Sequence, residues 1–107
     1  MRHIQTLVIS GDLALREQLS GILYTKEHVV EKCEDGQAGL LTALSKRLDL
    51  ILLEDSLPAL DGFSVLSRLR REKQTTVMMF ANDTSAQNRI DAYRRGVDDY
   101  LLSLIHI

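Results

Sequence analysis

The chain has 107 residues, which is enough for one domain and too few for two separate cores. Hydrophobic residues make up 45% and charged residues 26%, with one proline, and this composition argues against a disordered chain. The formal net charge of −2 lacks the basic excess of nucleic-acid-binding domains, so we expect no direct contact with nucleic acid. The basic cluster at 68–73 is interpreted as a solvated helix end.

Cysteine use and hydropathy favour a cytoplasmic protein. Cys33 is the single cysteine, which excludes an internal disulfide, and its place at the end of an apolar run predicts a core thiol rather than a nucleophile. No run approaches the ~18 apolar residues of a membrane span, and the first residues lack the apolar stretch of a signal peptide. We therefore expect a cytoplasmic location without membrane contact.

Short apolar runs alternate with helical patterns along the chain. Three of the runs are apolar nearly throughout, which is typical of parallel strands covered by helices on both faces. The predicted strands are 4–9, 28–33, 50–53, 77–81 and 100–105.

The segments between these strands carry apolar residues at helical spacing. The last of them is the best marked, because Thr84 and Gln87 have the spacing of a capping box, and Asp91 can pair with Arg95 one turn on. Gly96 is placed to end this helix. The apolar sets of the three earlier helices are Leu15, Leu19, Ile22 and Leu23, then Leu40, Leu41 and Leu44, then Val65, Leu66 and Leu69.

Alternation of strands and helices with short links predicts right-handed crossovers and an α/β fold. The expected architecture is a flavodoxin-like, doubly wound parallel sheet of five strands in the order 2-1-3-4-5. In that order the carboxyl ends of the first and third strands lie side by side and form the ligand crevice. We therefore expect one cluster of residues at this edge, made of Ser10, Gly11, Asp12, Glu54 and Asp55.

The stretch 49–63 carries the most specific pattern. An apolar strand ends at Glu54, a Leu-Pro turn places Pro58 four residues later, and an Asp-Gly pair begins at Asp61. This arrangement resembles the core of a CheY-like response-regulator receiver domain, a module of two-component phosphorelay signal transduction. The segments 7–16, 34–36 and 96–101 resemble the same family in the same order. The last is most similar to the transcription-regulator subgroup with a winged-helix DNA-binding output domain.

The resemblance does not extend to the chemistry of phosphoryl transfer. Receivers accept the phosphoryl group on an aspartate, with Mg²⁺ bound by that residue and by two acids after the first strand; a hydroxyl and a lysine bind the phosphoryl oxygens. At the matching positions this chain has Glu54 in place of the acceptor aspartate and Ser10 and Gly11 in place of the two acids. Ala81 stands in place of the hydroxyl residue, and Ser103 in place of the lysine. Asp12, one residue beyond the pair, keeps a carboxylate near the metal position.

We therefore predict a degenerate receiver that is not phosphorylated, is not an enzyme, and controls an output domain or a partner by protein-protein contacts. It is expected to have no catalytic residue, no metal site and no cofactor, with Mg²⁺ binding lost or weak. The loop 10–15 has one glycine, so it lacks a dinucleotide-binding motif, and no nucleophile elbow is present. The rival interpretation is a working phosphoacceptor that uses Asp55 or Glu54, with Mg²⁺ held by Asp12.

Two residues each allow two interpretations. Glu54 either imitates part of an acylphosphate, with about one negative charge where a phosphoryl group has nearly two, or is a drift product that is partly exposed in a loop. Tyr100 corresponds to the switch aromatic of the family, and the small Ala81 leaves room for an inward ring. The alternative for Tyr100 is an ordinary half-buried strand tyrosine.

The predicted domain covers residues 1–107. The family normally adds a fifth helix, and this sequence finishes on the apolar run 101–107, so we expect either a fragment lacking that helix and the output domain or a partner that covers the apolar face. The expected partner is its own output domain or another protein. That other protein can be a second copy of this chain, bound as a homodimer through the helix before Gly96 and the strand 100–105.

Overall fold

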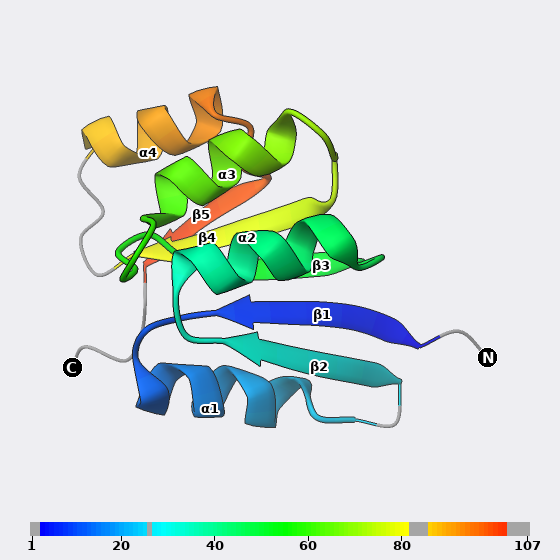
Figure 1. The fold of residues 1–107 in the computed structure, drawn as a ribbon. Coiled ribbons are helices and arrows are strands. Elements are labelled where there is room, and N and C mark those ends of the chain that lie inside the picture. Colours follow the sequence, from blue (N-terminus) through cyan, green and yellow to red (C-terminus); the bar gives the residue numbers. More distant parts are fainter. Residues whose placement is uncertain (1–2, 26, 82–85, 103–107) are drawn as a thin grey trace.

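Five strands and four helices alternate along the part of the chain that the computed structural model describes, residues 3–25, 27–81 and 86–102 (Figure 1). Within these ranges no helix has both the length and the apolar character needed to cross a membrane. The elements in order are β1 (Ile4–Ile9), α1 (Leu13–Leu23), β2 (His28–Cys33), α2 (Gly36–Ser45), β3 (Leu50–Glu54), α3 (Gly62–Arg70), β4 (Thr76–Ala81), α4 (Ala86–Arg94) and β5 (Asp99–Leu102).

The strands form one parallel sheet in the order β2-β1-β3-β4-β5, which confirms the predicted topology. β1 and β3 are neighbours, and their register pairs Ile9 with Leu53. The residue after β1 therefore lies beside the last residue of β3. On the other side of β3, Glu54 pairs with Phe80 of β4. This register brings the loop after β1 to the carboxyl end of β3.

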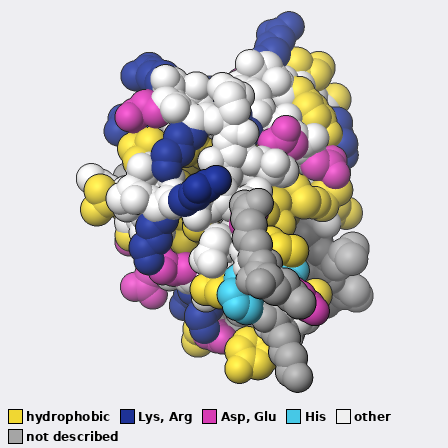
Figure 2. All heavy atoms as spheres, turned by 90° about the vertical axis from the view of Figure 1, so that its right-hand side faces the viewer, with side chains coloured by type: hydrophobic (Ala, Val, Ile, Leu, Met, Phe, Trp, Pro, Cys, Tyr) yellow, Lys and Arg dark blue, Asp and Glu magenta, His cyan; other side chains and the backbone are white. Residues whose placement is uncertain are grey.

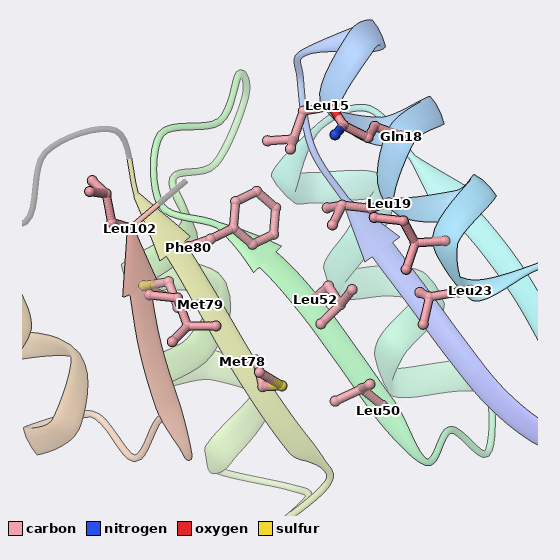
Figure 3. Close-up of a pocket in the computed structure, with 12 residues that line it drawn as sticks. Leu15, Gln18, Leu19, Leu23, Leu50, Leu52, Met78, Met79, Phe80 and Leu102 are labelled. Carbon is pink, nitrogen blue, oxygen red and sulfur yellow. The ribbon is translucent and has the colours of Figure 1, made fainter. Parts of the chain in front are cut away.

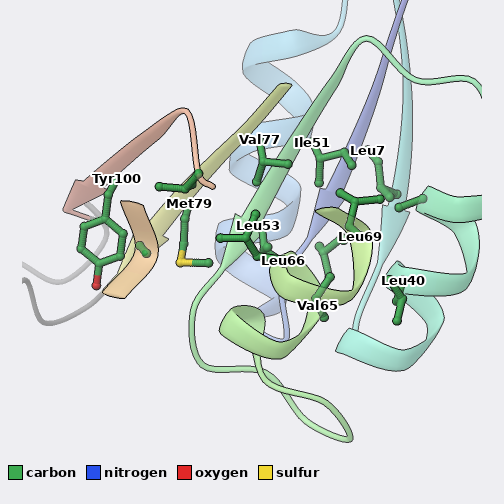
Figure 4. Packing of buried hydrophobic residues seen from close by; sticks show 14 of the residues in the cluster. Leu7, Leu40, Ile51, Leu53, Val65, Leu66, Leu69, Val77, Met79 and Tyr100 are labelled. Atoms are coloured by element: carbon green, nitrogen blue, oxygen red, sulfur yellow. The ribbon is translucent and has the colours of Figure 1, made fainter. Parts of the chain in front are cut away.

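Helices cover both faces of the sheet, α1 on one face and α2, α3 and α4 on the other (Figure 1). Side chains alternate between the faces along each strand, so each face has its own core cluster. On the α1 face the buried hydrophobic residues are Val8, Leu15, Leu52 and Phe80. The larger cluster on the opposite face (Figure 4) includes a row across four strands made of Ile9, Leu53, Met79 and Tyr100.

Polar side chains start the first three helices. Asp12, Asp35 and Asp61 are the N-caps of α1, α2 and α3, and each carboxylate accepts a hydrogen bond from the backbone N–H three residues later. At the other end of the fold, α4 ends as predicted: Asp91 and Arg95 form an ion pair of 3.0 Å, and Gly96 follows with a φ of 101°. The predicted capping residue Thr84 lies outside the described residues.

Several details differ from the sequence predictions. β3 continues through Glu54, and β4 begins one residue earlier than predicted, at Thr76. Leu41 of α2 and Ile22 of α1 are 70% and 68% exposed, so their assignment to core faces was wrong. Leu40 and Leu15 take the buried positions. Cys33 is only partly buried, with its Sγ 3.5 Å from Thr42 Oγ1. The predicted strand 100–105 begins one residue earlier, at Asp99, and is observed to residue 102; its remainder lies outside the described residues.

The side of the molecule at which the strands begin carries mixed charges (Figure 2). Basic and acidic side chains alternate over it instead of forming a field of one sign. From the basic cluster at 68–73, Arg70 Nε donates to Gly96 O at 2.8 Å and its guanidinium pairs with Asp98 at 3.1 Å. Lys73 Nζ donates to Ala43 O at 3.0 Å, near the end of α2. These two members of the cluster thus stabilise helix and loop ends.

Candidate functional site

The crevice at the carboxyl ends of β1 and β3 depends on a close approach of α3. Gly62 begins α3, and its N–H donates to Asp55 O at 2.8 Å. A Cβ at this position would lie 2.3 Å from Glu54 O, so only glycine fits. The Asp-Gly pair of the sequence motif is therefore explained by two needs, a carboxylate that caps α3 and a residue without a side chain against the end of β3.

Glu54 is buried in this crevice and bound to the loop that follows β1. Its side chain is 5% exposed, and Oε1 accepts hydrogen bonds from Ser10 Oγ and from Gly11 N, each at 3.0 Å. A buried carboxylate needs such partners, because an unpaired charge away from water is costly. The alternative in which Glu54 is partly exposed in a loop is wrong, because Glu54 ends β3 and is almost fully covered.

Ser10 connects Glu54 to the start of α1. Its side chain is fully buried, and while Oγ donates to Glu54 it accepts a hydrogen bond from Asp12 N at 3.1 Å. Arg16 donates from a terminal guanidinium nitrogen to Ser10 O at 2.8 Å. Asp12 Oδ1 accepts from Leu15 N at 3.1 Å, so the carboxylate expected near a metal position is the N-cap of α1.

The carboxylates of the crevice do not converge. Within residues 3–25, 27–81 and 86–102, no three His, Cys, Asp or Glu side chains form a group that could hold a metal ion. Asp55 is half-buried, and its N–H donates to Phe80 O at 3.0 Å. The structure therefore brings Ser10, Gly11 and Glu54 into contact as predicted, through two hydrogen bonds to Glu54 Oε1.

Asp61 has a perturbed pKa. Burial raises the pKa of its carboxyl, but hydrogen bonds from the backbone and side chain of Ser64, with smaller contributions from Phe63 N–H and the charge of Arg95, bring it below the ordinary value of 3.8. The cause is the N-cap geometry at α3, in which Asp61 Oδ1 accepts from Ser64 N at 3.0 Å.

The two expected switch positions lie on the other face of the sheet. Ala81 is fully buried and Tyr100 is 1% exposed, and both belong to the cluster under α3 and α4 (Figure 4). The inward ring agrees with the predicted orientation and differs from the half-buried alternative. Whether the two residues act as a switch stays a prediction. Ser103, the lysine-equivalent position, lies outside the described residues.

Sequence reasoning missed Arg89 of α4. Its guanidinium carbon lies over the Tyr100 ring, 5.5 Å from the ring centroid, and one of its terminal nitrogens donates to Tyr100 O at 3.3 Å. Close by, Tyr93 Oη lies 3.2 Å from Asp99 Oδ1. The only signal in the sequence is that Arg89 precedes the buried Ala92 by one helical turn.

An apolar groove runs along the α1 face of the sheet, between α1 and the strands β3, β4 and β5 (Figure 3). It has a volume of about 390 Å³. Leu102 and Ile22 contribute to its lining and are 51% and 68% exposed. The expectation that a further helix or a partner covers this face stays a prediction.

Comparison with known proteins supports the family resemblance. The model of the response regulator receiver domain matches residues 6–104. The transcriptional activator protein PfeR of Pseudomonas aeruginosa is 41% identical over 95 residues, which are 89% of this chain and 31% of that protein. The DNA-binding dual master transcriptional regulator RpaA of Synechocystis is 36% identical over 98 residues, 89% of this chain and 41% of that protein. The chain thus spans less than half the length of these relatives.

Solved structures share the fold. The receiver domain of the Francisella response regulator 1452 matches with a TM-score of 0.88 at 25% identity, over 94% of this chain and 84% of that one. A two-component response regulator from Clostridium difficile matches with a TM-score of 0.90 at 24% identity, over 97% of this chain and 86% of that one. Strand order, crevice and family match agree, and the chain belongs to the response regulator receiver domain family of two-component signal transduction.

Proposed function

We propose that this chain is a phosphorylation-independent receiver module, which controls an output domain or a protein partner through contacts of α4 and β5. The observation that carries the proposal is the pair of hydrogen bonds from Ser10 Oγ and Gly11 N to Glu54 Oε1, each 3.0 Å long. In the family these three positions hold the phosphoryl acceptor and the acids that bind Mg²⁺. Here they bind one another.

The chemistry of phosphoryl transfer supports the same conclusion. Mg²⁺ needs hard oxygen ligands in octahedral order, and the charge that develops on the transferring group must be neutralised. Ser10 and Gly11 supply no carboxylate, and the Asp12 carboxylate caps α1. Ala81 has no hydroxyl for a phosphoryl oxygen. These replacements remove the groups on which the reaction depends.

The surface of α4 and β5 supports a role in protein contacts. Ile90 and Tyr93 lie one helical turn apart on α4 and are 46% and 45% exposed. The hydrogen bond between Tyr93 and Asp99 fastens this side of α4 to β5. Exposed apolar and aromatic side chains in one place favour a protein partner. The named relatives are transcriptional regulators, so we propose a cytoplasmic output domain or a second copy of the chain as the partner.

The experiment measures self-association by sedimentation velocity, with and without Mg²⁺ and acetyl phosphate. We expect the same association in both conditions, weakened by Ile90→Glu. The matched control is Leu41→Glu, because Leu41 is also an exposed apolar helix residue, 70% exposed, but lies on α2. Association that appears only with the phosphodonor would favour the rival function, an Mg²⁺-dependent phosphoacceptor that uses Asp55 or Glu54.

A further inference from the structure

Tyr100 is almost completely covered although β5 is an outer strand of the described sheet. Its ring is 1% exposed, and β4 is the only strand beside it. Tyr100 belongs to the same buried cluster as Ala92 of α4 and Met79, its register partner on β4 (Figure 4). The guanidinium of Arg89 lies over the ring at 5.5 Å from its centroid. Arg89 itself is exposed, so it forms the boundary between the ring and water.

Arg89 also binds the backbone of the same residue. A terminal guanidinium nitrogen of Arg89 donates to Tyr100 O at 3.3 Å, and Tyr100 N donates to Asp99 Oδ1 at 2.9 Å. An outer strand exposes backbone groups that have no further strand to pair with. In β5 the side chains of Arg89 and Asp99 bind these outward backbone groups of Tyr100. Arg89 therefore contacts both the ring and the edge of β5, and it connects them to α4.

Glu54 contacts a different part of the fold. Its hydrogen bonds run to Ser10 and Gly11 on the β1 side of β3. Alternation along the strands also places Glu54 on the α1 face with its strand neighbour Leu52, whereas Ala81 and Tyr100 lie in the cluster on the opposite face. The carboxylate at position 54 therefore has no direct way to hold the ring.

We propose that Arg89 is the positioning residue that holds Tyr100 inward, and that it keeps the α4–β5 face in one state regardless of the residue at position 54. This inference rests on the proposed function and deepens it, because it names the residue that fixes the contact face. A receiver without a phosphoryl group needs another stabilising interaction that favours one of its two packings over the other.

The test labels the three tyrosines with 3-fluorotyrosine and follows Tyr100 by fluorine NMR. The difference in chemical shift between H₂O and D₂O measures solvent exposure, and Tyr24→Phe and Tyr93→Phe assign the signals. Arg89→Met removes the charge and the donors but keeps a long apolar stem. We expect a solvent-exposed Tyr100 signal, with a roughly fivefold rise in the outward population. Arg94→Met is the matched control, because Arg94 is exposed on the same helix and makes neither contact.

Two further variants complete the test. Arg89→Lys keeps the charge without the flat guanidinium, so we expect partial exposure of the ring. Glu54→Gln should leave Tyr100 protected. The inference is overturned if Tyr100 stays protected in folded Arg89→Met, or if Glu54→Gln exposes it as strongly. Should Arg89→Met fail to fold, an unchanged signal in Arg89→Lys overturns the inference. A phosphoryl adduct on the chain would contradict the proposed function and leave these ring measurements unaffected.

Discussion

The hydroxyl of Ser10 donates a hydrogen bond of 3.0 Å to Glu54 Oε1, and this bond joins two positions that the receiver family uses for metal binding and phosphoryl transfer. Gly11 N makes a second bond to the same oxygen. Both donors belong to the loop between β1 and α1, so Glu54 fastens this loop to the end of β3. The carboxylate is then a structural link between two strands.

Loss of the Ser10 hydroxyl should lower stability. Ser10→Ala removes a donor to a buried carboxylate and the acceptor for Asp12 N, so we expect the free energy of unfolding to fall by ~1 to 3 kcal/mol. Urea denaturation followed by circular dichroism measures it. Ser45→Ala is the control, since Ser45 is exposed and bonds only to carbonyls of its own helix. Equal losses in the two variants would mean that the bond to Glu54 contributes no special stability.

Mg²⁺ should bind weakly to the unmodified chain. Few carboxylates face the crevice to offset the reluctant dehydration of the ion, so isothermal titration at low millimolar Mg²⁺ should give little saturable heat. The double variant Ser10→Asp, Glu54→Asp restores two acids and should bind more tightly. Gly11 is left unchanged because a Cβ there would lie 3.0 Å from Pro58 Cδ. Clean one-site binding by the unmodified chain would show that its own carboxylates rebuild the site.

A larger side chain at position 81 should displace the Tyr100 ring. Ala81 is fully buried in the same cluster as the ring, so Ala81→Thr adds two heavy atoms to a buried position and should cost ~1 to 3 kcal/mol. Fluorine NMR should detect a more exposed Tyr100. Ala43→Thr overfills the same cluster under α2 and should lower stability without exposing the ring. If the Tyr100 ring stays protected from solvent in Ala81→Thr, the side chain at position 81 does not control the position of the ring.

The fold was predictable because the inner strands β1, β3 and β4 are largely buried and so appear as apolar runs in the sequence. The runs 4–9 and 28–33 match β1 and β2 at both ends. The order of the strands followed from the handedness of crossovers and the receiver motif. Leu41 was misassigned because several leucines compete for one helix face, and spacing alone does not choose among them.

The site was predictable in position but not in its contacts. The pattern brought Ser10, Gly11 and Glu54 together, yet their hydrogen bonds depend on the register of β1 against β3, which the sequence does not encode locally. Asp12 matched a metal position by spacing and serves as an N-cap, a role that the same residue type favours. Arg89 was missed because stacking on a ring of another element leaves no periodic signal.

Asp61 should make stability depend on acidic pH. Its folded pKa lies below the ordinary value of 3.8, so the carboxylate contributes stability above the unfolded pKa, and this contribution is lost as the pH falls through the folded pKa. Asp61→Asn keeps a capping side chain without the titrating group. Urea denaturation from pH 5 downward should therefore show a weaker decline in the variant. Parallel curves for the two proteins would contradict the lowered pKa.

We propose that the family's phosphorylation site has become an internal hydrogen-bonded link in this chain. The most direct test incubates the chain with Mg²⁺ and acetyl phosphate and measures its intact mass, with an active receiver treated in parallel as the positive control. We predict that the mass of the chain stays unchanged while the control gains a phosphoryl group. A stoichiometric adduct that survives acid and is released by hydroxylamine would be an acylphosphate, and it would contradict the account.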